Sequence, residues 1–85
     1  MITLDGRGLH FVEVKTRFAK SVDPLANVTY TKKRNMVKAA GDFLDSDDRK
    51  YLKDKELFFD IITITLEGEG MELQYYPEAF VPIYL

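Results

Sequence analysis

Two charged residues, Glu13 and Lys15, stand in a segment that is otherwise rich in apolar and β-branched residues, Leu9 to Thr16. Side chains two positions apart on a β-strand project from the same face, so Glu13 and Lys15 are predicted to lie side by side, with Phe11. Charges on the inner face of a buried strand are unfavourable unless they are paired, bound to a metal or functional. This pair is therefore the first candidate for chemistry.

The chemistry that suits a Glu-x-Lys strand is metal-assisted cleavage of a phosphodiester. Mg²⁺, or Mn²⁺ in its place, prefers oxygen ligands such as the carboxylate of Glu13 and the backbone carbonyl of Val14. Beside such a metal, Lys15 can orient or help to deprotonate a water molecule and neutralise charge on a phosphate. Glu13 and Lys15 are thus the predicted catalytic residues. The pattern alone is a weak signal, because Glu-x-Lys is common in the cross-strand ion pairs of exposed strands.

A basic segment continues from this strand. Residues 13 to 38 carry seven basic and two acidic side chains, a net charge of +5, whereas residues 39 to 85 carry four basic and eleven acidic ones, a net charge of −7. Such a split predicts a basic face that binds a polyanion, with a solvated loop and helix surface as the alternative. The predicted nucleic-acid-binding residues are Arg17, Lys20, Lys32, Lys33, Arg34 and Lys38.

The first half of the chain is predicted to supply two strands and the main helix. A strand ends at residue 4, and Asp5-Gly6 is expected to supply the positive φ of a tight hairpin. The Glu-x-Lys strand follows over residues 9–16. Thr29 is expected to cap a helix over residues 30–44, whose apolar residues follow helical spacing.

The second half is predicted to complete a small α/β domain that covers residues 1–85. A short helix is expected to end at Lys53, and strands over residues 58–66 and 71–75 form a hairpin. Pro77 and Pro82 are expected to interrupt regular structure in the tail. A helical crossover between the second and third strands favours parallel pairing of the two, in a mixed sheet of order β-β-α-(α)-β-β.

The block from Leu9 to Arg17, preceded by Asp5-Gly6, closely resembles the YraN family of predicted endonuclease-like proteins, in which an Asp-Gly turn leads into Phe-Val-Glu-Val-Lys-Thr-Arg. Further matches are Lys32, Arg34, Ala39-Ala40, Phe59-Asp60-Ile61-Ile62 and Ala79-Phe80. Family members are similar to Holliday-junction resolvases and other PD-(D/E)xK enzymes. The resemblance implies a restriction endonuclease-like core, a Mg²⁺ or Mn²⁺ site at Glu13 and Lys15, and a nucleic-acid partner, with DNA expected.

One departure from the family pattern concerns the second metal-binding carboxylate. In the family, a helix and a strand reading Gly-Glu-hydrophobic-Asp precede the Asp-Gly turn. Aligned on Asp5-Gly6, that aspartate falls one position before Met1. The resemblance therefore implies a core without its first helix, most of its first strand and the aspartate. Such a chain is expected to be a weakly active or inactive nuclease.

Two other classes of function stay open. A non-catalytic nucleic-acid-binding module would use the basic face alone, and a protein-interaction domain would keep Glu13 and Lys15 as a structural ion pair. Salt-dependent DNA binding separates these two classes, and metal binding that is abolished in Glu13→Ala separates the nuclease-like class from both. An uncovered sheet edge and an apolar tail predict a homodimer.

Several other residues have a structural interpretation as well as a functional one. Asp60 is expected to be a buried aspartate paired with Lys15 or Arg17, or else part of the site. His10 is expected to be a packed or surface histidine, and Asp5 to point into solvent. The aromatic residues of the tail favour packing over base stacking: Tyr75, Tyr76, Phe80 and Tyr84. The chain has no cysteine and no apolar run of membrane-spanning length, so a cytoplasmic location without a membrane partner is expected.

Overall fold

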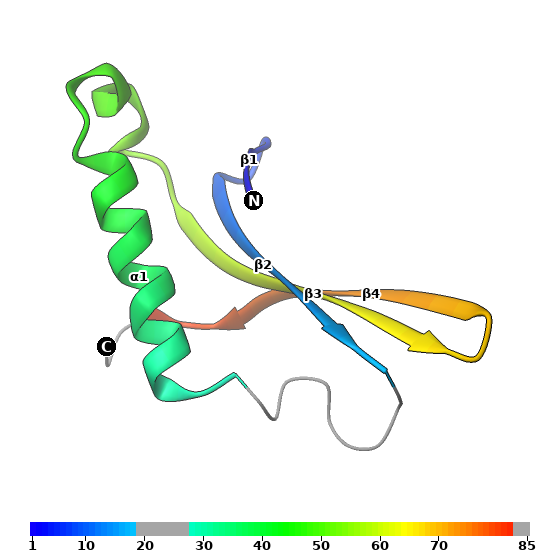
Figure 1. Ribbon diagram of the computed structural model, residues 1–85. Coiled ribbons are helices and arrows are strands. Elements are labelled where there is room, and N and C mark those ends of the chain that lie inside the picture. The colour runs from blue at the N-terminus through cyan, green and yellow to red at the C-terminus, as the bar shows by residue number, and fades with distance from the viewer. Residues whose placement is uncertain (19–27, 83–85) are drawn as a thin grey trace.

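A computed structural model describes residues 1–18 and 28–82 as one mixed sheet with a helix across one of its faces (Figure 1). The strands follow the order β1-β2-β3-β4. The outer pairs are antiparallel and the central pair, β2 and β3, is parallel, so the predicted α/β class and helical crossover are confirmed. The elements are β1 (Ile2–Leu4), β2 (Leu9–Arg17), α1 (Tyr30–Leu44), the 3₁₀ helix η1 (Asp47–Leu52), β3 (Leu57–Glu67) and β4 (Gly70–Phe80).

Helix α1 begins and ends where its sequence predicts. The side-chain oxygen of Thr29 accepts the backbone N–H of Lys32 at 3.2 Å, which satisfies one of the free donors of the first turn. The apolar residues then recur at helical spacing and pack toward the core: Met36, Val37, Ala40, Phe43 and Leu44. The helix ends at Asp45, whose N–H donates to the carbonyl of Gly41 at 3.1 Å.

The hydrophobic core lies between α1 and the sheet and is dominated by phenylalanine. The rings of Phe11 and Phe80 stack on either side of Phe59, with ring centroids 5.6 and 5.2 Å apart. Phe43 of α1 meets the edge of Phe11. Because each aromatic side chain buries a large apolar area, this stack fixes α1 against β2 and β3. The packing role predicted for Phe80 is therefore confirmed.

Strand β4 is longer than predicted. It continues past Pro77 to Phe80, so the expectation that regular structure ends after Tyr75 is wrong. The register pairs Ile61 with Tyr76 but Phe59 with Phe80, which leaves three residues of β4 opposite Asp60. Proline is tolerated on an edge strand and at such a bulge, because its backbone nitrogen does not have to donate a hydrogen bond to a neighbouring strand there.

Part of the sheet face opposite α1 is apolar and exposed. Its side chains include Val14, Met71, Leu73 and Tyr75, all of which are exposed. Figure 1 shows the connected ends of β3 and β4 projecting away from α1. One chain does not test the predicted homodimer, which stays a prediction. Among the described residues, no helix is long and apolar enough to cross a membrane.

The turn between β1 and β2 is built by a side chain and not by a positive φ at Gly6. Oδ1 of Asp5 accepts the backbone N–H groups of Arg7 and Gly8 at 2.8 and 3.2 Å, so the expected role of Gly6 is wrong. The glycine that the fold requires is Gly8. A Cβ added there would lie 2.3 Å from the carbonyl oxygen of Glu56, where β2 meets the start of β3.

The substitution Gly8→Ala is therefore expected to destabilise the chain by about 2 kcal/mol or more, because backbone must move to admit the methyl group. Gly6→Ala is the matched control, since nothing lies within 4 Å of its added Cβ. Its effect is expected to stay within about 0.5 kcal/mol. Urea denaturation of the two variants and the parent measures the difference, and equal stability of the two variants would contradict this close contact.

Candidate functional site

Glu13 and Lys15 lie on the face of β2 that α1 covers, together with Phe11. The parallel register places Glu13 beside Ile61 and Lys15 beside Thr63 of β3. Ile61 and Thr63 are only 1% exposed, so the two charged side chains rest on a buried part of the central strand. The predicted arrangement, two charges on the inner face of a buried strand, is the observed one.

Glu13 is paired with a helix residue and not with Lys15. The Nζ of Lys32, in the first turn of α1, lies 2.8 Å from Oε1 of Glu13. Both side chains are about one-third exposed, which leaves the pair within reach of solvent. They line a hollow of about 470 Å³ together with Thr29, Thr31, Asn35, Met36 and Ala39. This space is within the range of small-ligand sites.

Lys15 is the unusual residue of the site. Its ammonium nitrogen is buried and has no hydrogen-bond partner in the part of the chain that the structure describes. Burial, followed by the nearby charges of Lys32 and Arg17, lowers the pKa of Lys15, against the attraction of Glu13. The hydroxyl oxygen of Thr63, the neighbour of Lys15 on β3, is also buried without a partner in the same described residues. Unpaired buried donors of this kind are rare in proteins, and each calls for an explanation such as a functional role or a bound water or ion.

The described residues place few metal ligands beside Glu13. Residues 1–18 and 28–82 include no group of three or more His, Cys, Asp or Glu side chains arranged to hold a metal ion. The carbonyl of Val14 does face an open edge. Met1 and Val12 exchange backbone hydrogen bonds at 2.8 and 3.0 Å, and backbone groups alternate sides along a strand, so those of Val14 point beyond the start of β1. Glu13 and Val14 would supply one carboxylate and one carbonyl oxygen, so the other ligands of a Mg²⁺ or Mn²⁺ ion there would be water or phosphate oxygens.

The predicted nucleic-acid-binding residues are spread over several directions. Lys32 faces Glu13, whereas Lys33 lies over the ring of Phe80, 5.7 Å from its centroid. Arg34 and Lys38 are exposed on α1. The Nε of Arg17 donates to the hydroxyl of Thr65 at 2.9 Å. Lys20 lies outside the described residues. Lys15 and Lys32, and not the whole predicted set, share the Glu13 site.

Asp60 belongs to a second polar cluster on the opposite face of the sheet. Its Oδ2 accepts hydrogen bonds from Nδ1 of His10 at 2.7 Å and from the hydroxyl of Tyr75 at 2.5 Å. Its Oδ1 accepts the backbone N–H of Glu78 at 2.9 Å. The expectation that Asp60 pairs with Lys15 or Arg17 is wrong, because the register places Asp60 beside Val12, on the face of His10.

His10 lies between two carboxylates. It is 4% exposed, so it is the packed histidine that the sequence allowed, and its Nε2 lies 3.0 Å from Oδ2 of Asp5. Asp5 therefore does not simply point into solvent. Burial works to lower the pKa of His10, but its contacts with Asp60 and Asp5 outweigh burial and raise the pKa above 6.5. Burial would raise the pKa of Asp60, but the bonds from Tyr75, Glu78 and His10 lower it below 3.8.

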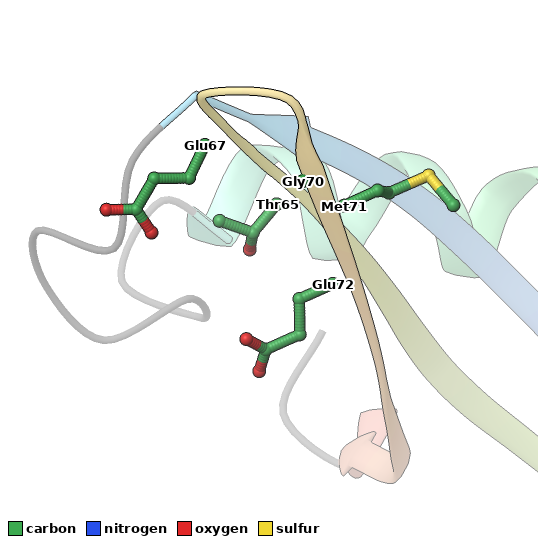
Figure 2. A pocket seen from close by; sticks show the side chains of 5 residues that line it. All are labelled: Thr65, Glu67, Gly70, Met71 and Glu72. Atoms are coloured by element: carbon green, nitrogen blue, oxygen red, sulfur yellow. The ribbon is translucent and has the colours of Figure 1, made fainter.

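A separate hollow lies at the hairpin end of β3 and β4. It is lined by Thr65, Glu67, Gly70, Met71 and Glu72. Figure 2 shows the carboxylates of Glu67 and Glu72 on the same side of the hairpin, while Met71 turns away from them. The two carboxylates make this hollow acidic, in contrast to the lysines beside Glu13.

Comparison with known sequences identifies the family of this chain. The profile of the uncharacterised protein family UPF0102 matches residues 1–64. This chain belongs to the UPF0102 family. A UPF0102 protein of Dictyoglomus turgidum is 36% identical over 85 residues, which cover 94% of this chain and 68% of that protein. A UPF0102 protein of Geobacter metallireducens is 36% identical over 86 residues, 99% of this chain and 67% of that protein. No solved structure matches the chain.

Membership in UPF0102 confirms the YraN-like resemblance of the sequence. The matched region includes Glu13, Lys15 and Lys32, but the family description states no activity. Sequence reasoning missed the partner of Glu13 and the buried hydroxyl of Thr63. The sequence of β3 does contain a signal for the burial of Thr63. Thr63 and Thr65 alternate with isoleucine, and both are polar residues on the buried face of the strand.

The His10–Asp60 cluster predicts a pH dependence of stability. A histidine whose pKa is raised by folding stabilises fully below its unfolded pKa of 6.5, and this contribution is lost as pH rises through the folded pKa. Asp60, whose pKa is lowered, contributes above 3.8 and loses its contribution as pH falls through the folded pKa. The cluster is therefore expected to stabilise most between pH 3.8 and pH 6.5.

Urea denaturation at a series of pH values tests this expectation through the variant His10→Asn. The difference in unfolding free energy between parent and variant should shrink as pH rises above 6.5. Tyr75→Phe is the control, because it removes one bond to Asp60 and leaves His10 in place. A difference between parent and His10→Asn that does not change with pH would contradict protonation of His10 in the folded chain.

Proposed function

We propose that this chain acts on nucleic acid as a nuclease-like protein, with Glu13 and Lys15 placed at a phosphodiester. The observation that carries the proposal is the buried ammonium group of Lys15, which lacks a hydrogen-bond partner among the described residues. A buried charge without a partner is strongly unfavourable, and a phosphate oxygen supplies the acceptor and the opposite charge together. Lys32 adds a second cation at the solvent side of the same site.

Cleavage requires more than the described residues contain. Glu13 is the carboxylate of the site, and a catalytic metal usually needs a second one. The register that pairs Ile2 with Phe11 and Met1 with Val12 puts the position before Met1 opposite Glu13. An aspartate there would share the face of Glu13, since directly opposed residues of antiparallel strands point to the same side. The proposal is therefore binding by this chain, and cutting only when that carboxylate is supplied.

Binding is tested with a fluorescein-labelled DNA duplex and fluorescence anisotropy over a range of salt concentrations. The substitution Lys15→Met keeps most of the side-chain volume and removes the charge. It is expected to weaken binding and to lower the slope of log K against log salt by about 0.9, because one fewer phosphate is neutralised. Lys50→Met is the matched control, because Lys50 lies in η1 at the opposite end of α1 from Lys32 (Figure 1).

The same experiment separates binding from cutting. The chain itself should leave the duplex intact with or without Mg²⁺, whereas a form extended by Gly-Glu-Ile-Asp before Met1 should gain Mg²⁺-dependent cleavage that Glu13→Gln abolishes. Identical salt slopes for the parent and Lys15→Met would contradict phosphate binding at Lys15. Cleavage by the 85-residue chain that Glu13→Gln removes would contradict the need for a second carboxylate.

A further inference from the structure

The ammonium group of Lys32 lies beside the carboxylate of Glu13, where a metal ion could otherwise bind. Lys32 is held there by the start of α1, because its backbone N–H is bonded to the Thr29 cap while its Nζ lies 2.8 Å from Oε1 of Glu13. Its position is thus set by the helix and not by the flexibility of a long side chain alone. An ammonium at this distance neutralises the carboxylate in the way that a bound cation does.

Two unused donors lie next to this pair. The Nζ of Lys15 and the Oγ1 of Thr63 are both buried and without hydrogen-bond partners in the described part of the chain. The two residues are register neighbours on β2 and β3, so their side chains leave the sheet on the same face as Glu13. Thr63 is only 1% exposed, and a buried hydroxyl normally has a partner.

The chemistry of this group differs from that of a metal site. Lys15 and Lys32 bring two positive charges, Glu13 brings one negative charge, and Thr63 brings a neutral donor. Divalent cations need several oxygen ligands, and the described residues include no group of three acidic, histidine or cysteine side chains that could hold a metal ion. Ammonium and hydroxyl donors instead suit the oxygens of a phosphate.

We propose that the Glu13–Lys15–Lys32–Thr63 group binds a phosphate without a divalent metal, with the ammonium of Lys32 in the role that the metal would have. This inference rests on the proposed function, because there the phosphate belongs to a nucleic-acid backbone. Free inorganic phosphate has the same chemistry. The two sources are separated by testing them in turn.

The proposal makes Glu13 a competitor of the ligand. In a metal-dependent site the carboxylate holds the cation that holds the phosphate, so its removal weakens phosphate binding. In a metal-free site the carboxylate repels the phosphate and occupies Lys32, so its removal strengthens binding. The sign of the effect of Glu13→Gln therefore distinguishes the two kinds of site.

The experiment is a titration with inorganic phosphate in the presence of EDTA, followed by NMR signals of the described residues. Glu13→Gln is expected to bind phosphate about three-fold or more tightly than the parent, and Lys32→Met about ten-fold more weakly. The matched controls are Lys50→Met, whose ammonium lies in η1 at 3.4 Å from Oδ1 of Asp47, and Glu69→Gln, whose side chain is exposed in the β3–β4 turn. Both should stay within about two-fold of the parent.

Weaker phosphate binding by Glu13→Gln, or parent binding that EDTA abolishes and Mg²⁺ restores, would overturn the proposal. Equally weakened binding in Lys32→Met and Lys50→Met would also overturn it, because the effect would then be one of net charge. If phosphate binds with the expected pattern while the DNA duplex does not bind, the metal-free phosphate site stands and the proposed action on nucleic acid fails.

Discussion

The carboxylate of Asp60 joins three of the four strands of the sheet. It accepts hydrogen bonds from the imidazole of His10 in β2, and from the hydroxyl of Tyr75 and the backbone N–H of Glu78 in β4. Asp60 is fully buried, and a carboxylate is tolerated there because both of its oxygens accept hydrogen bonds and the raised pKa of His10 favours a positive partner. The bulge in β4 serves the same contact, since it turns the N–H of Glu78 toward the carboxylate.

This network lies on one face of the sheet and fixes the site on the other. Asp60 beside Val12 sets the parallel register in which Glu13 meets Ile61 and Lys15 meets Thr63. A slip of one residue would move the charged side chains of β2 to the opposite face. The phenylalanine stack under α1 supports the same register, but apolar rings tolerate small shifts that hydrogen bonds do not. The position of Lys15 therefore depends on Asp60.

Local patterns predicted most of the elements, because their causes are local. The cap at Thr29, the helical spacing of α1 and the alternation of β2 are properties of neighbouring residues. The partners of Asp60 and Glu13 were not predictable in this way. The contact between His10 and Asp60 spans 50 positions and depends on the register of two strands, and the contact between Glu13 and Lys32 depends on where α1 crosses the sheet. The sequence pattern underestimates the length of β4, because the bulge that accommodates Pro77 depends on the register of β3 and β4.

The most direct test of this account is the stability of Asp60→Asn, measured by urea denaturation. Asparagine keeps the shape of the side chain but replaces one acceptor oxygen with a donor and removes the charge that faces His10. The account predicts a decrease of about 3 kcal/mol or more in the free energy of unfolding, whereas the exposed helix position Asp42→Asn should change stability by no more than about 0.5 kcal/mol. Equal stability of Asp60→Asn and the parent would contradict the claim that Asp60 holds the sheet in register.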